Sequence, residues 1–182
     1  MKLNKTSKMV YMALLVSMAL ILSLIERMIP VPFITPGAKL GLANLVIMLS
    51  VYTLDSYKDS FIVLILRLLL STMLGGNVSM FLYSSVGGVL SFIVILLVKN
   101  LGGKYVSIIG VSAAAAVFHN IGQLIVASLI LNNFNIFLYL PLLSIAGIGT
   151  GIFIGISCNY ILSHLLKLPQ FKKDSSLSAK NS

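Results

Sequence analysis

Charged residues are scarce in this chain, and acidic ones are the scarcest. Only 9% of the 182 residues are charged, with 4 acidic side chains against 13 basic ones, whereas a soluble domain usually carries about 25% charged residues. The acids are scattered along the chain, at Glu26, Asp55, Asp59 and Asp174. The sequence therefore has no aspartate-rich motif that would bind a magnesium diphosphate, and it has no Walker motif for a nucleotide. These absences predict a protein that is not an enzyme and uses no cofactor.

Metal-binding side chains are also few. Cys158 is the single cysteine, which excludes a disulfide within the chain and a zinc site built from cysteines. The histidines His119 and His164 lie in different apolar segments. Because a structural metal needs several such ligands together, the sequence predicts no metal site.

Apolar residues make up 58% of the chain and fall into long runs between short polar turns. A membrane-spanning helix needs about 20 apolar residues, which leaves room for six spans and no separate soluble domain. We read the first run as a retained span rather than a signal peptide, because it continues directly into Glu26 and Arg27. The predicted spans cover residues 9–29, 40–53, 60–74, 80–98, 106–131 and 141–166.

This pattern predicts an all-α integral membrane protein with one six-helix transmembrane domain, residues 1–168. The residues that follow, 169–182, are rich in Lys and Ser, which predicts a basic, disordered cytoplasmic tail. The net charge of +9 is spread over loops and tails rather than gathered on one face. It therefore favours a membrane as the partner over a nucleic acid.

Basic residues also predict the orientation, because they gather on the cytoplasmic side of a membrane protein. If both termini are cytoplasmic, only Arg27 and Lys39 lie outside, and Arg67 lies within the membrane. The lysines at positions 2, 5, 8, 58, 99, 104, 167, 172, 173 and 180 then all lie inside. This bias predicts six spans with both termini in the cytoplasm.

Charged side chains at the end of the first span are candidate site residues. Glu26 and Arg27 close the first apolar run, directly before a loop with two prolines. Arg67 lies in the middle of the third span. Ionisable side chains near hydrocarbon are costly, so they need a partner, a cavity or water. These residues line a functional site in one reading, where Glu26 pairs with Arg67 or, in competition, with Arg27. In the other reading they form a buried charge network that holds the first and third spans together.

The fifth span carries a second polar group. His119 and Gln123 are four residues apart and share one helix face, with Asn120 beside them. Such side chains either line a cavity or form hydrogen bonds between spans. With three further polar residues at the outer ends of spans, the candidate substrate-binding set is Glu26, Arg27, Lys39, Asn44, Arg67, Asn77, His119, Asn120 and Gln123. Basic groups outnumber the one acid in this set, so a ligand with an anionic portion is favoured.

Small residues at helical spacing predict close packing of helices. They occur in the first span at Ala13 and Ser17, and in the sixth at Gly147, Gly151 and Gly155. We predict these positions as contacts with a partner protein. Packing within the chain is the alternative, above all for the three glycines.

Two stretches carry a resemblance to a known family. The first is residues 22–44, with Glu-Arg-x-Ile-Pro-x-Pro-Phe followed by Pro-Gly-Ala-Lys-Leu-Gly-Leu-Ala-Asn. The second comprises residues 107–110 and 116–124, with His119-Asn120 and Gly122-Gln123. Over nearly its whole length the chain resembles the small bacterial membrane family named heptaprenyl diphosphate synthase component I, also called Gx transporters.

That family is similar to the substrate-binding S components of energy-coupling factor (ECF) transporters. The resemblance implies a six-helix bundle in a bacterial cell membrane that captures a vitamin or cofactor-like molecule from outside. A scaffold subunit and two ATPases would supply the motor, with Ala13 and Ser17 docking the scaffold, although Ser17 departs from the usual Ala. Two alternatives stay open: a non-catalytic membrane partner of a polyprenyl diphosphate synthase in isoprenoid quinone synthesis, and a stand-alone secondary transporter.

Overall fold

The computed structural model describes residues 4–28, 41–103, 105–165 and 167, and this part of the chain forms helices joined by short turns, with no strand. Each of the six predicted apolar runs forms one α-helix, so the all-α prediction is confirmed for these residues. The predictions for Lys39 and for the tail 169–182 lie outside the described residues. The helices are α1 (Lys5–Met28), α2 (Asn44–Thr53), α3 (Tyr57–Met73), α4 (Val78–Gly102), α5 (Ile108–Ile130) and α6 (Leu140–Leu165), with the 3-10 helix η1 (Phe134–Tyr139) before α6.

The helices differ in length, and length bears on how many can cross a membrane. Four helical segments of the described chain are long and apolar enough to do so: α1, α4, α5 and the continuous segment Phe134–Leu165. The helix α3 has 17 residues and α2 only 10. A helix rises about 1.5 Å per residue, so α2 extends about 15 Å, half of a hydrocarbon core of about 30 Å. Helix length therefore supports a membrane protein with four helices of spanning length.

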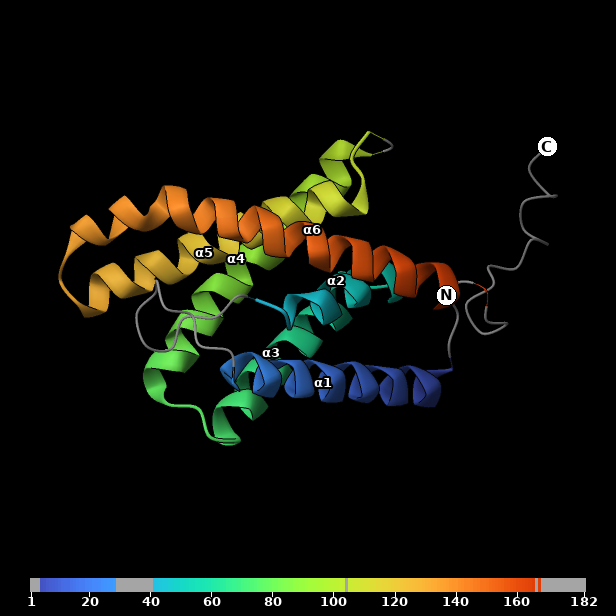
Figure 1. Cartoon of the computed structure of the whole chain (residues 1–182). Helices are drawn as coiled ribbons and strands as arrows, with labels where there is room; N and C mark the ends of the chain where they lie inside the picture. The colour runs from blue at the N-terminus through green and yellow to red at the C-terminus, as the bar shows by residue number, and fades with distance from the viewer. Residues whose placement is uncertain (1–3, 29–40, 104, 166, 168–182) are drawn as a thin grey trace.

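The short helix α2 lies in the centre of the bundle. It contacts α1, α3, α4 and α6, and Figure 1 shows it between α6 on one side and α1 with α3 on the other. Eight of its ten residues are buried. A helix that is apolar on all sides needs such an enclosed position. The main apolar core accordingly forms around Val46, Ile47 and Leu49 of this helix.

Polar residues set the start of four helical segments. The side chain of Asn77 accepts a hydrogen bond from the backbone N–H of Met80 at 2.7 Å, and Ser107 accepts one from Gly110 at 3.1 Å. Ser56 and Asn133 act in the same way for α3 and η1. These side chains satisfy N–H groups that have no partner inside the helix, which explains why the helices begin in the polar turns.

The helices α5 and α6 pack closely through the glycines Gly147, Gly151 and Gly155. A Cβ atom added at Gly151 would lie 2.6 Å from the Cα of Ala113, and one added at Gly155 would lie 2.6 Å from the Cα of Ile109. All three glycines are buried. The helix α5 already covers the face that carries these glycines. We predicted a partner contact at this face, and the structure instead shows packing within the chain.

Candidate functional site

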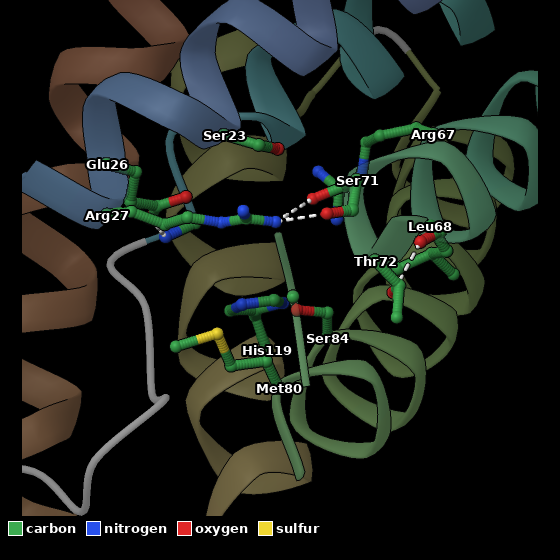
Figure 2. Close-up of a pocket in the computed structure, with 12 residues that line it drawn as sticks. Ser23, Glu26, Arg27, Arg67, Leu68, Ser71, Thr72, Met80, Ser84 and His119 are labelled. Carbon is green, nitrogen blue, oxygen red and sulfur yellow. Dashed lines mark hydrogen bonds between the residues drawn. The ribbon is translucent and has the colours of Figure 1, made fainter. Parts of the chain in front are cut away.

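A cavity lies at the end of the bundle where α1 and α3 end and α4 begins. Figure 2 shows Arg27 reaching from α1 toward Ser71 of α3. His119, Met80 and Ser84 lie below its guanidinium group in this view. The lining residues come from four helices and two adjoining loops: Ser23, Glu26, Arg27, Gly41, Arg67, Leu68, Ser71, Thr72, Gly76, Met80, Ser84 and His119. The four charged or imidazole side chains of the predicted set that the structure brings together are therefore Glu26, Arg27, Arg67 and His119.

Helical spacing explains which α1 and α3 side chains face the cavity. On α1, Ser23 precedes Glu26 by three residues and Arg27 by four. On α3, Arg67 precedes Ser71 by four residues. Residues three or four apart lie on one helix face, so each helix turns one short polar stripe toward the other across the cavity.

Glu26 is held by the chain that enters α2. Its carboxylate accepts hydrogen bonds from the backbone N–H groups of Gly41 and Leu42, the latter at 3.1 Å, and the side chain is 3% exposed. Gly41 has φ +86° and lies so close to His119 that an added Cβ would be 3.2 Å from the ring. Only glycine adopts this backbone conformation without cost. The two N–H donors hold the carboxylate against the chain that enters α2.

Arg27 joins α1 to the end of α3. Its guanidinium group donates to the backbone carbonyl of Ser71, to the Ser71 hydroxyl at 2.9 Å and to the carbonyl of Leu74 at 3.2 Å. The last carbonyls of a helix have no partner inside it, and they carry partial negative charge. A cation at this position therefore satisfies the end of α3 and fixes α1 beside it.

Arg67 lies deeper and is bound less completely. It is 4% exposed, and its charge is attracted by that of Glu26. Its Nη1 atom is buried and has no hydrogen-bond partner within the described part of the chain. The same holds for Nε of Arg27 and for the hydroxyl of Ser84. Because a buried polar group without a partner is costly, these three groups indicate a place for water or a ligand.

His119 is positioned by its neighbours on α4 and α5. A Cβ atom added at Gly87 would lie 2.9 Å from its Nδ1 atom, so the glycine makes room for the ring. The Nε2 atom of Gln123 lies 2.9 Å from the Nε2 atom of His119. One hydrogen bond therefore joins the two side chains, with donor and acceptor set by the tautomer of the imidazole ring. Gln123 itself is buried behind His119 and does not line the cavity.

The remaining predicted residues lie elsewhere. Asn44 is buried beside Gly41, next to the cavity but not on its wall. Asn77 is exposed and caps α4, as described above. Asn120 donates to the backbone carbonyl of Leu143 on α6 at 2.8 Å. This is a hydrogen bond between helices, which the sequence analysis gave as the alternative to cavity lining.

Several lining residues were not predicted from the sequence. Ser23 and Ser71 could have been found, since each is one helical turn from a charged residue that was chosen. Ser84 and Gly76 carry no such signal, because their position depends on how α4 packs against α3 and α5. Spacing in sequence finds residues on one helix, whereas these two come to the site through tertiary contacts.

The cavity is small in this conformation. It leaves about 10 Å³ for the centre of a water-sized sphere, which is room for about one water molecule. Its described walls carry two arginines and one carboxylate. No group of three or more His, Cys, Asp or Glu side chains that could hold a metal ion occurs within the described residues. Hydrogen bonding and charge are therefore the means of binding that this cavity offers.

The sequence profile of the family heptaprenyl diphosphate synthase component I matches residues 15–161. The match covers most of the chain, from the middle of α1 to the last turns of α6. The chain belongs to this family. Searches of curated proteins and of solved structures found no significant match.

Proposed function

We propose that this protein is the substrate-binding membrane subunit of an importer of the ECF type, for a vitamin or cofactor-like small molecule. The proposal treats all six helices as membrane spans, with both termini in the cytoplasm and no catalytic role for the chain. It is supported above all by the cavity, where three buried hydrogen-bonding groups lack a partner among the described residues. Polar groups that converge on a buried site can fix the orientation of a bound small molecule, and ionisable side chains near hydrocarbon mark substrate sites in membrane proteins.

The charge at the two ends of the bundle supports the orientation. At the end opposite the cavity, Lys8 forms an ion pair with Asp59. Lys99 donates to the carbonyl of Val51 at 2.7 Å and lies over the ring of Tyr52, 4.4 Å from its centroid. Basic residues gather on the cytoplasmic side. The cavity end then faces outward, where a substrate would arrive.

The orientation can be tested by labelling single cysteines in a Cys158→Ala background. Asn133 precedes η1, at the end of the bundle where α5 stops. A cysteine placed there should react with an impermeant maleimide added to intact cells. Labelling only after the cytoplasmic side is opened would contradict the topology. A cysteine at Lys58, next to the Lys8–Asp59 pair, is the matched control with the opposite expected result.

A second function is favoured by the family's name. Heptaprenyl diphosphate synthase component I implies a partner enzyme component, so the chain would serve as a non-catalytic membrane partner of a polyprenyl diphosphate synthase. A stand-alone secondary transporter is the third candidate. Purification from native membranes separates them. An ATPase pair with a membrane scaffold supports the ECF proposal, a soluble prenyltransferase supports the second candidate, and neither supports the third.

The outer face of α1 offers a test of partner binding within the same experiment. Ala13 and Ser17 are both exposed. The Ser17 hydroxyl donates to the carbonyl of Ala13 at 2.9 Å, which is a hydrogen bond within α1. Replacing both with Leu should abolish co-purification of the scaffold and leave the isolated protein folded. Thr150, which bonds to the carbonyls of its own helix in the same way, gives the control Thr150→Leu. Unchanged co-purification in the double variant would reject this docking face.

Mass spectrometry of small molecules retained after mild detergent purification tests the binding function directly. The proposal expects one compound enriched with the purified chain and reduced in variants of the cavity. If no compound is enriched, and uptake by cells that lack the protein equals that of normal cells, the importer proposal fails.

A further inference from the structure

We propose that the cavity binds a singly charged anionic group of its ligand, a carboxylate rather than a diphosphate, and that Arg67 is the residue that pairs with it. The inference deepens the proposed import function and rests on it for the rest of the ligand. Three observations support it: the net charge of the described walls, the hydrogen bonds that each of the two arginines already makes, and the buried donors that lack an acceptor.

The charge of the described walls is one unit positive. Arg27 and Arg67 contribute two positive charges and Glu26 one negative charge. Glu26 accepts hydrogen bonds from two backbone N–H groups, and His119 is counted as neutral. In a buried site an uncompensated charge is costly. One negative charge from the ligand balances the described walls, whereas a diphosphate would leave them with excess negative charge.

The two arginines are not equivalent. Arg27 has three acceptors on α3 and already serves as a connection between helices. Arg67 is the more deeply buried of the two, and its Nη1 lies on the cavity without an acceptor among the described residues. Guanidinium groups bind carboxylates through paired hydrogen bonds. Of the two arginines, Arg67 is therefore the one whose terminal guanidinium nitrogen is available to an anion.

Three groups of the cavity that lack a hydrogen-bond partner among the described residues are able to donate. They are Nη1 of Arg67, Nε of Arg27 and the hydroxyl of Ser84, and an arginine nitrogen cannot accept. Such a set needs acceptors, which a carboxylate supplies and an amide or ammonium group does not supply as well.

The test uses the full chain in lipid nanodiscs and four probes at constant ionic strength: acetate, acetamide, methyl phosphate and pyrophosphate. The shift of the unfolding temperature is measured against probe concentration. We expect stabilisation by acetate and none by acetamide, its neutral counterpart, or by pyrophosphate. Stabilisation by pyrophosphate or methyl phosphate that exceeds that by acetate would overturn the inference and favour the synthase-partner function.

Two variants assign the effect to Arg67. Arg67→Gln should raise the half-saturating acetate concentration about tenfold or more, because it removes a charge-assisted hydrogen bond. Lys5→Gln changes the net charge equally, at an exposed position at the far end of α1, and should leave the acetate response unchanged. An equal response in Arg67→Gln and the parent protein would overturn the inference. If Arg67→Gln does not fold, two other measurements decide whether a carboxylate pairs with Arg67. They are the acetate response of Arg67→Lys and the comparison of acetate with acetamide and pyrophosphate in the parent protein.

The inference and the proposed function can fail separately. A retained compound that carries no negative charge, with retention unaffected by Arg67→Lys, overturns the carboxylate site and leaves the import function standing. Arg67-dependent binding of acetate without any retained compound or uptake supports the anion site, and the import function then fails.

Discussion

The two sides of the bundle are held together in different ways. The helices α4, α5 and α6 approach through glycines: a Cβ atom added at Gly122 would lie 2.7 Å from the Cα of Gly87, and the α5–α6 contacts are equally close. The helix α1 places Leu15, Val16 and Ala19 in the apolar core, but at its cavity end it is joined by polar side chains, Arg27 to the end of α3 and Glu26 to Gly41 and Leu42 before α2. Figure 1 shows these two sides, α5 with α6 and α1 with α3, separated by α2.

This difference has a physical consequence for binding. Backbones in direct contact cannot separate slightly without losing many dispersion contacts at once. A contact made by a few polar side chains can exchange one partner for another, such as water or a ligand. The cavity lies on the polar side, so we expect the α4–α5–α6 side to stay fixed and the α1–α3 side to adjust when a ligand binds.

The largest effect is expected on the glycine side. In Gly151→Ala the new Cβ would meet the Cα of Ala113 at 2.6 Å, so the two helices must separate, at a cost of about 1–3 kcal/mol. The control is Gly149→Ala on the same helix, where an added Cβ meets nothing within 4 Å. Unfolding in detergent micelles measures both. Equal stability of the two variants would show that the close approach of α5 and α6 contributes little.

The next effect is expected at the polar connection between α1 and α3. Arg27→Gln shortens the side chain and removes bonds to Ser71 and Leu74, at a cost of about 1–2 kcal/mol for a partly exposed charged donor. Hydrogen exchange of the last turn of α3 should then rise by about tenfold, since 1.4 kcal/mol corresponds to that factor. Ser71→Ala removes one of the acceptors and should show a smaller rise. Unchanged exchange in Arg27→Gln would mean that apolar contacts alone hold α1 in place.

The third effect concerns ligand binding. His119→Ala removes a cavity wall and should weaken ligand retention by about tenfold, equivalent to 1.4 kcal/mol. Gln123→Ala acts through His119 by removing the bond at 2.9 Å, so we expect a loss of the same kind. Asn120→Ala is the control, because Asn120 bonds to Leu143 on α6 instead. Lower thermal stability with unchanged retention in the two test variants would assign them to contacts between helices.

The sequence was sufficient to locate the helices and much of the cavity. The apolar runs and the polar turns at Asp55–Asp59, Gly75–Asn77 and Asn132–Asn135 predicted six helices, because each turn supplies residues that cap or break a helix. Charge within an apolar run is costly, which predicts Glu26, Arg27 and Arg67 as residues of the site. All three line the cavity.

Other features depend on contacts between helices and could not be predicted in this way. Polarity alone did not distinguish Asn77, which caps α4, from a residue of the site. It did not show that Asn120 turns to α6 while His119 turns to the cavity, since the two are adjacent on α5. The length of α2 was also overestimated, at residues 40–53 against Asn44–Thr53.

The smallest effect is expected at the far end of α1, and it tests whether the polar attachment of this helix is concentrated at the cavity. The Tyr11 hydroxyl donates to Thr53 Oγ1 at 3.0 Å, but Thr53 keeps its own bond to the carbonyl of Leu49. Tyr11→Phe removes this hydrogen bond at a partly buried position and should cost only about 0.5–1 kcal/mol. Tyr105→Phe, at a side chain 99% exposed, should cost nothing measurable. A loss in Tyr11→Phe as large as that in Arg27→Gln would mean that α1 is anchored equally at both ends, and movement confined to its cavity end would then be excluded.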